Sequence, residues 1–246
     1  MRSIIKIFLA ALLLSSTTYS FAKTQPAINN TDQQKTEDRH LSGFNAVDLA
    51  GSFDVYITQG ATESVKVEAP DEVIDHIITE VNGGVLKIYN KNDHFHWGDL
   101  FGSHKKIAIY VVAKDLNSIN VSGSGDVFFR DGIHTSSLKL RVTGSGDMIG
   151  KVDVKIIESS ISGSGDMKIS GRADNSTVSV GGSGDFSGRG LVTINTSVHV
   201  VGSGDADINA SGSVNASVSG SGDIRYTGGA KNIMSSKSGS GDIERF

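Results

Sequence analysis

The sequence predicts an all-β protein: a single-chain parallel β-helix, or solenoid, of about seven coils with a β-rich N-terminal capping region that includes one short helix. Three observations predict it. The tetrapeptide Gly-Ser-Gly-Asp recurs seven times, its spacing is nearly constant, and the residues that flank it alternate between apolar and polar. We expect a right-handed solenoid, although the sequence itself does not determine the handedness.

The repeat defines coils of 18–21 residues, since the steps between successive tetrapeptides are 21, 19, 19, 20, 18 and 19 residues. A fixed period of this length indicates one structural unit per repeat. The first glycine and the aspartate of each copy form the predicted structural corners: Gly123 and Asp126, Gly144 and Asp147, Gly163 and Asp166, Gly182 and Asp185, Gly202 and Asp205, Gly220 and Asp223, Gly239 and Asp242.

The flanking residues predict a strand on each side of the corner. Two positions before the first glycine stand Val121, Val142, Ile161, Val180, Val200, Val218 and Lys237, with polar neighbours between the apolar positions. Directly after the aspartate stand Val127, Met148, Met167, Phe186, Ala206, Ile224 and Ile243. Period-two alternation is typical of a strand with one buried face, so each repeat reads as strand, corner, strand and a return loop with a glycine or small residue.

The corner residues suit close stacking of one coil on the next. Glycine reaches positive φ and lets backbones approach, and aspartate accepts hydrogen bonds from N–H groups in a turn. Coils stacked about 4.8 Å apart would align the aspartates in a column. Lys237 and Arg245 stand at otherwise inward positions of the last coil, as expected where a stack ends in water.

Other architectures fit less well. The apolar spacing after residue 112 is two rather than three or four, which excludes amphipathic helices. An antiparallel meander would place varied turns every 8–12 residues or so instead of one invariant corner about every 19.

The N-terminal half is β-rich without a clean repeat. Residues 51–54 resemble a degenerate first corner, and residues 70–80 place apolar side chains at helical spacing after Pro70, which predicts the short helix that covers the open end of the stack. We expect a cap with the first coils over 42–113 and the repeat stack over 114–246. Strands are predicted at Asp54–Thr58, Val65–Glu68, Val85–Tyr89 and Lys106–Val112.

The N-terminus predicts export. Residues 1–22 have the basic, apolar and small-residue regions of a cleavable signal peptide, and the polar residues 23–41 read as a flexible leader. The chain has no Cys, which excludes disulfides and a lipid-modified cysteine. Removal of two basic residues with the signal leaves 21 basic and 27 acidic residues, a formal charge of −6, which argues against nucleic acid as a partner. We expect a periplasmic or cell-surface protein that is not lipid-anchored and has no transmembrane segment.

Several segments also resemble a known bacterial family. They are Gly43-Phe44-Asn45-Ala46-Val47, residues 55–60 with 64–69, residues 84–88, and the Val-Ser-Gly-Ser-Gly-Asp repeats from Val121. In these features the chain is similar to the auto-transporter adhesin head GIN domain family, formerly a domain of unknown function. The resemblance covers about residues 42–246. It implies a β-solenoid exported by Bacteroidetes-like bacteria with a role at the cell surface, and it brings no catalytic residues.

Two features are candidates for metal or ligand binding. A column of carboxylates invites Ca²⁺, although calcium-binding β-rolls use a much shorter repeat, so we favour a structural role for the corner aspartates. The loop 93–104 is rich in histidine and aromatic residues. Candidate Zn²⁺ ligands there are His94, His96, His104, Asp93 and Asp99, whereas Phe95, Trp97 and Phe101 either contact a glycan or protein partner or pack on the end of the stack.

No catalytic or cofactor-binding constellation is recognisable. His134 and His199 lie within the coils, but no nucleophile elbow or metalloprotease spacing occurs. The leading hypothesis is an exported, non-enzymatic binding or adhesion module that presents its polar faces or its aromatic loop to a glycan or surface protein. A purely structural envelope protein and a polysaccharide-active β-helix enzyme are the two alternatives.

Overall fold

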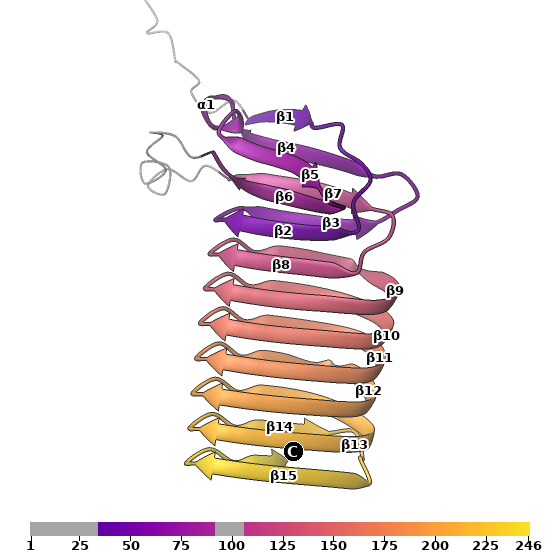
Figure 1. The fold of residues 1–246 in the computed structure, drawn as a ribbon, viewed down its shortest axis with the longest axis vertical. Coiled ribbons are helices and arrows are strands. Elements are labelled where there is room, and N and C mark those ends of the chain that lie inside the picture. Colours follow the sequence, from indigo (N-terminus) through magenta and orange to yellow (C-terminus); the bar gives the residue numbers. More distant parts are fainter. Residues whose placement is uncertain (1–33, 92–105) are drawn as a thin grey trace, which may run out of the picture. The chain divides into compact units, whose positions relative to one another are not determined.

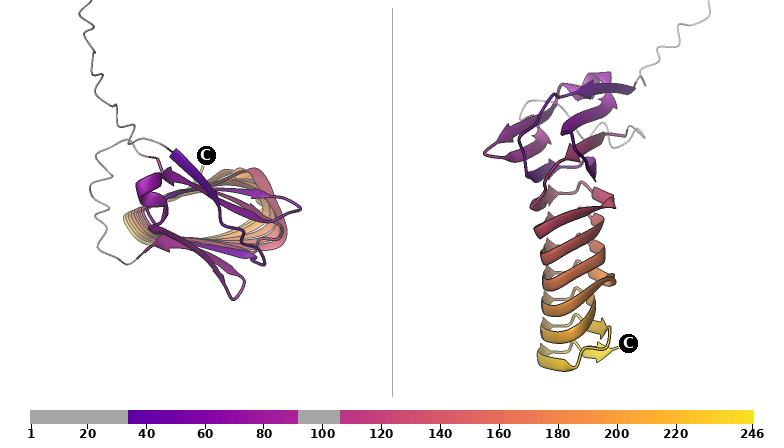
Figure 2. Two further views of the ribbon diagram at one scale, coloured as in Figure 1. Left: turned by 90° about the horizontal axis from the view of Figure 1, so that it is seen from above. Right: turned by 90° about the vertical axis from the view of Figure 1, so that its right-hand side faces the viewer.

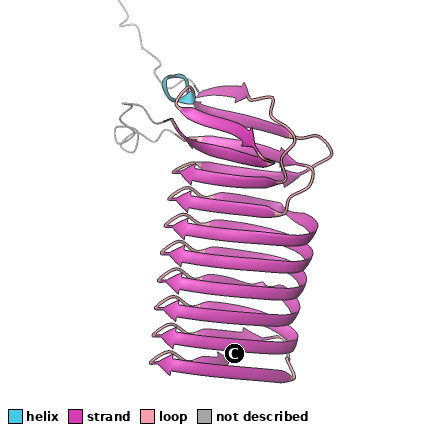
Figure 3. Ribbon diagram, in the orientation of Figure 1, coloured by secondary structure: helices cyan, strands magenta, loops and turns pink. Residues whose placement is uncertain are grey.

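The computed structural model describes residues 34–91 and 106–246, which lie within one compact unit, Asp32–Phe246. These residues form a β-solenoid with its coils stacked one on another (Figure 1). In Figure 1 the nearer strands run towards the corners on the left while the coils descend, so the solenoid is right-handed. Almost all of it is strand, with a single helical turn at the N-terminal end (Figure 3). The predicted fold class is therefore confirmed.

The repeat stack begins with β8 (Ser118–Gly123) and ends with three short strands. The full coils between them are β9 (Val127–Gly144), β10 (Met148–Gly163), β11 (Met167–Gly182), β12 (Phe186–Gly202) and β13 (Ala206–Gly220). The closing strands are β14 (Ile224–Thr227), β15 (Asn232–Gly239) and β16 (Ile243–Arg245). All strand pairings within this stack are parallel. They are in register at the corners and along the strands that lead to them, so Val142 lies over Ile161 and Gly144 over Gly163, and the register shifts only near the opposite bend.

The vertical register confirms the inward columns that the alternation predicts. Val121, Val142 and Val200 are fully buried, and Met148, Met167 and Ala206 form a second buried column on the other side of the corner. Burying an aliphatic side chain of this size stabilises the fold by about 1.5–3 kcal/mol, and here each one packs on its counterparts in the coils above and below. The core is thus a continuous apolar column along the stack axis.

The expected return loops are wrong. Each of β9 to β13 continues as strand through the bend opposite the corner, because successive bends also stack (Figure 2). The pairing runs through most of this bend between β10 and β11 and is interrupted by register shifts there in the next two coils. Gly171 shows how close the approach is: its φ is +108°, and a Cβ there would overlap the carbonyl oxygen of Val152.

The cap combines parallel and antiparallel pairs. It contains β1 (Gln34–Asp38), β2 (Ala46–Gly51), β3 (Asp54–Gln59), β4 (Ser64–Pro70), β5 (Ile77–Asn82), β6 (Val85–Asn90) and β7 (Ala108–Ala113). β2 and β3 pair in parallel with β8 and β9 and form the coil above the repeat stack, whereas β4 pairs antiparallel with β7 and β5 with β6. The N–H groups of Ser124 and Gly125 donate to Gly51 O, so the degenerate first corner is confirmed.

Two N-terminal predictions need correction. The helix α1 covers only Asp71–Ile74, and residues 77–82 form β5, because the β-branched run from Ile77 fits a strand and pairs with β6. Residues 34–38, assigned to a flexible leader, form β1 on the edge of β4. Their polar composition reflects an edge strand whose side chains are mostly exposed.

The remaining predictions about the N-terminus lie outside the described residues. These are the signal peptide 1–22 and the leader up to residue 33. Within residues 34–91 and 106–246, no helix has the length and hydropathy that crossing a bilayer requires.

Candidate functional site

The corner aspartates form the predicted column, and each one ties two coils together. The backbone N–H of one corner aspartate donates to Oδ1 of the aspartate in the preceding coil, with N–O distances of 2.8–2.9 Å. At the same corner the serine and second-glycine N–H groups donate to the first glycine's carbonyl oxygen in the preceding coil. One carboxylate oxygen of each preceding aspartate is therefore occupied by the fold, which supports a structural role for these residues.

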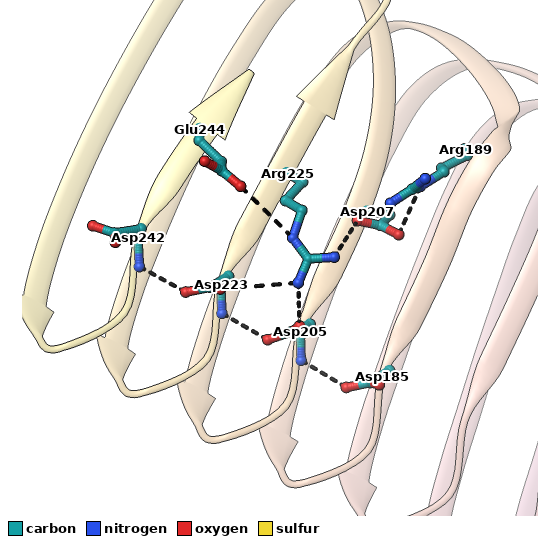
Figure 4. Close-up of polar contacts among 8 residues, drawn as sticks. All are labelled: Asp185, Arg189, Asp205, Asp207, Asp223, Arg225, Asp242 and Glu244. Atoms are coloured by element: carbon teal, nitrogen blue, oxygen red, sulfur yellow. Dashed lines mark hydrogen bonds and ion pairs between the residues drawn. The ribbon is translucent and has the colours of Figure 1, made fainter. Parts of the chain in front are cut away.

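The C-terminal part of the column carries a positively charged clamp. The Arg225 guanidinium lies 2.6 Å from Asp205 Oδ2, and 3.7–3.9 Å from carboxylate oxygens of Asp207, Asp223 and Glu244 (Figure 4). Arg225 reaches these groups because it stands two residues after its corner, at an outward position of the following strand. An alignment of the repeats could have identified Arg225 in the sequence, because the residue two positions after the corner aspartate is Phe128 or Ile149 in other coils.

A groove runs beside the column. Its volume is about 320 Å³, and its lining includes Ile149, Lys168, Arg225 and the corner residues Asp147, Asp166, Asp185 and Asp205. Among the described residues, no group of three or more His, Asp or Glu is arranged so that it could hold a metal ion. Aspartates line most of the groove, and Arg225 forms ion pairs with the aspartates at its C-terminal end.

Three aromatic rings stack on the outer surface where the cap meets the coils. The centroids of Tyr110 and Tyr56 are 5.4 Å apart and those of Tyr56 and Phe128 are 5.1 Å apart, with interplanar angles of 20° and 19°. Lys106 and Arg130 lie over the Tyr56 and Phe128 rings. Tyr56 is stacked between the other two rings and Arg130 covers Phe128, so Tyr110, which is 41% exposed, is the ring of this ladder that is most open to a ligand.

Two pKa shifts accompany this ladder. Burial, and then a hydrogen bond to Glu68, raises the pKa of Tyr110. The hydrogen bond between Lys106 Nζ and the Tyr56 hydroxyl raises the pKa of Lys106. Both shifts reflect local packing on the outer surface of β3 and β7.

A second small cavity, of about 260 Å³, lies at the return bend beside His134. Asp153 Oδ2 is 2.9 Å from the Arg172 guanidinium and 4.0 Å from His134 Nδ1. The hydrogen bond from Arg172 is the main cause that lowers the pKa of Asp153. No serine or threonine is hydrogen-bonded to His134 among the described contacts, so the cluster offers no activated nucleophile.

The sheet nearer the viewer in Figure 1 runs along the whole stack, and its strands end at the corners. In its C-terminal coils, the second halves of β11, β12 and β13 together with β15, the outward residues form a grid of four columns. We call this grid the polar face. It consists of Asn175, Thr177, Ser179, Gly181, Asn195, Ser197, His199, Val201, Ser213, Asn215, Ser217, Ser219, Asn232, Met234, Ser236 and Ser238.

Side-chain hydrogen bonds hold one column of the polar face. Asn195 Nδ2 donates to Asn175 Oδ1 at 3.1 Å, and Ser213 Oγ donates to Asn195 Oδ1 at 2.7 Å. Each Asn still has hydrogen-bonding capacity directed to solvent. Because the β-strands beneath are in register, these groups recur at a fixed spacing of about 4.8 Å along the stack.

The predicted Zn²⁺ ligands and aromatic contact residues of loop 93–104 lie outside the described residues. They are Asp93, His94, Phe95, His96, Trp97, Asp99, Phe101 and His104. The zinc and partner-binding hypotheses for this loop stay predictions.

Comparison with known proteins places these features in context. A family model described as "Putative auto-transporter adhesin, head GIN domain" matches residues 43–230. A search of curated proteins found no match. The chain is similar to the crystal structure of a "putative adhesin" from Bacteroides fragilis, with a TM-score of 0.81, 25% identity, and coverage of 87% of this chain and 97% of that chain.

Two structures from Parabacteroides distasonis show the same fold. One, a "putative adhesin", has a TM-score of 0.69 and 25% identity, and the comparison covers 87% of this chain and 97% of that chain. The other, a "putative lipid binding protein", has a TM-score of 0.68 and 23% identity over 87% of this chain and 96% of that chain. At that identity the second likeness concerns the fold alone.

Proposed function

The chain belongs to the auto-transporter adhesin head GIN domain family, and on this basis we propose that it is an exported, non-enzymatic adhesion module whose solenoid surface binds a glycan or a surface protein. Family and structural neighbours alike support an adhesion-type role. The finer parts of the proposal, namely export, the absence of enzymatic activity and the type of ligand, rest on the surface of the solenoid and on the N-terminal sequence.

One observation carries the proposal: the polar side chains of the stack are spread over a broad, regular sheet surface and do not converge. A catalytic site needs a nucleophile or base, a group that orients it and a space for the reacting atom. The described clusters around Asp153 and Arg225 are ion pairs on the surface. A repeating surface, by contrast, suits many weak contacts with an extended ligand, whose effects combine through multivalency.

The proposal is tested by binding rather than by turnover. The purified protein would be applied to arrays of glycans and of cell-surface proteins, with thermally unfolded protein as the control, and incubated with uronate polymers to detect cleavage. Saturable binding by folded protein without turnover is expected. Absence of binding to every ligand and to intact cells would contradict the proposal and favour a structural envelope protein, whereas turnover would favour the polysaccharide-active enzyme.

Two further measurements locate the activity. Protease treatment of intact cells should degrade the protein if it is displayed at the surface, as adhesion requires. The variant Trp97→Ala separates the aromatic loop from the coils. Loss of binding in this variant would assign the contact to loop 93–104, and unchanged binding would assign it to the stack.

A further inference from the structure

The polar face differs from every other described surface of the stack in having no formal charge. None of its positions carries Asp, Glu, Lys or Arg, and all but Gly181, His199, Val201 and Met234 are Ser, Thr or Asn. Charged residues make up 20% of the chain, and the same outward columns carry Lys139, Arg141 and Glu158 in the two preceding coils. The neutrality therefore calls for a physical reason.

Charges in the same coils are found on the other sheet, at the corner, and at the return bend, where Arg172 and Asp174 lie. β11 and β12 carry Lys168 and Arg189 on the opposite sheet, and the corner column is acidic. On the polar face's own sheet, charged residues at outward positions occur further towards the N-terminus, where Lys139 and Glu158 pair at 2.9 Å. Lys237 of β15 stands at an inward position and pairs with Asp242 at the open end of the stack. The charged residues of these coils thus lie outside the polar face, whose outward positions carry no formal charge.

We propose that the polar face is the ligand-binding surface and that its ligand is an uncharged polysaccharide. This inference rests on the proposed adhesion function and specifies its site and ligand class. An uncharged face has no counterion to offer, so a charged polymer that docks there would lose hydration without gaining an ion pair. Hydroxyl and amide side chains, in contrast, act as both donors and acceptors and match the hydroxyl groups of a neutral sugar chain.

The face is also ordered before any ligand arrives. The hydrogen bonds of Asn195 with Asn175 and Ser213 fix side chains that would otherwise lose rotamer freedom on binding. Because the coils are in register, the polar groups repeat along the stack, so a polymer with a regular repeat can contact several coils at once. Affinity should consequently rise with the length of the sugar chain.

The experiment uses two double variants that add the same charge on the same two strands. Thr177→Lys with Ser197→Lys places two cations on the polar face, and Ser170→Lys with Ser187→Lys places them on the opposite sheet. Binding would be measured by pull-down and calorimetry with insoluble and soluble neutral glucans and mannans, with alginate and heparin as charged probes. Circular dichroism and the melting temperature check that both variants remain folded.

The expected result is that the parent protein binds at least one neutral polysaccharide, that affinity increases with chain length, and that the polar-face variant loses at least tenfold in affinity while the opposite-sheet variant retains it. Binding only to charged polymers or to proteins, or equal losses in the two variants, would overturn this inference and leave the adhesion proposal standing. Absence of binding to any glycan, protein or cell would overturn both.

Discussion

Replacing Gly165 by alanine should separate two neighbouring corners of the stack. Gly165 is the second glycine of its corner, and a Cβ there would overlap the carbonyl oxygen of Gly146 in the preceding coil. The obstacle is backbone rather than a flexible side chain, so it cannot rotate away. The two corners have to move apart.

The cost follows from the hydrogen bonds that hold these corners together. The N–H groups of Ser164 and Gly165 donate to Gly144 O at 2.9 and 3.1 Å, and Asp166 N donates to Asp147 Oδ1 at 2.9 Å. A typical hydrogen bond contributes about 1 kcal/mol net to stability. Weakening all of them should lower the free energy of unfolding by about 3 kcal/mol.

Gly181 provides the matched control. It directly precedes a corner, and a Cβ there would meet Ile161 O at 3.5 Å, an ordinary contact. Gly181→Ala should therefore leave stability unchanged or raise it by about 0.4–1 kcal/mol, because alanine restricts the unfolded chain. Urea denaturation followed by far-UV circular dichroism would compare the two variants. If their unfolding free energies differ by less than about 1 kcal/mol, the corner backbones are not in contact and the reasoning is refuted.

Three other substitutions test separate parts of the structure. Ser159 is buried with no hydrogen-bond partner for its hydroxyl, so Ser159→Ala should raise stability by about 1 kcal/mol in the same assay, and a loss would show that the hydroxyl is satisfied. Lys237 stands in the inward column of the last coil and pairs with Asp242 at 2.6 Å. A charge at the open end of the stack opposes pairing with a second molecule, so Lys237→Val should increase self-association in light scattering. An unchanged molar mass at every concentration would contradict this. Because the folded-state pKa of Tyr110 is raised by burial and Glu68, the stability linked to it is present below the unfolded value of about 10 and is lost as pH rises above it. Tyr110→Phe should therefore reduce the loss of stability between neutral and strongly alkaline pH, and identical pH profiles would contradict this.

The repeat stack could be predicted from sequence because equivalent positions of every coil have the same environment and carry similar residues. Inward positions such as Val142 and Val200 must be apolar, and the corner glycines must lack a Cβ, so the constraints recur at each step of the sequence. The same logic identified Lys237 as the end of the column, which the structure confirms with its exposed ion pair to Asp242. Because the environment repeats, a single sequence shows several times which type of residue each position of a coil requires.

The cap could not be predicted as well because each of its elements occurs once. Val73, Ile74 and Ile77 fit a helical period, yet the chain turns at residues 75–76 and Ile77 begins a strand that pairs with β6. That pairing depends on a partner outside the local window. β1 was missed for a related reason, since its polar residues are stabilised by the edge of β4 rather than by burial.

The polar face was only partly visible in the sequence. Ser, Thr and Asn at alternate positions indicate an outward surface, but the segregation of charge becomes apparent only when the register assigns Lys168 and Thr177 to opposite sheets. The Arg225 clamp likewise requires the lateral neighbours of its column.

The central claim is that each tetrapeptide begins a new coil directly over the last. Because the chain has no cysteine, spin labels can be attached to pairs of cysteines introduced at the corner serines, one pair in each variant. Label distances by pulsed electron paramagnetic resonance should grow by about 4.8 Å per corner, so Ser124 and Ser203, four corners apart, should give about 19 Å, and Ser124 and Ser240, six apart, about 29 Å. Distances that fail to increase in proportion to the number of intervening corners would contradict a stacked solenoid.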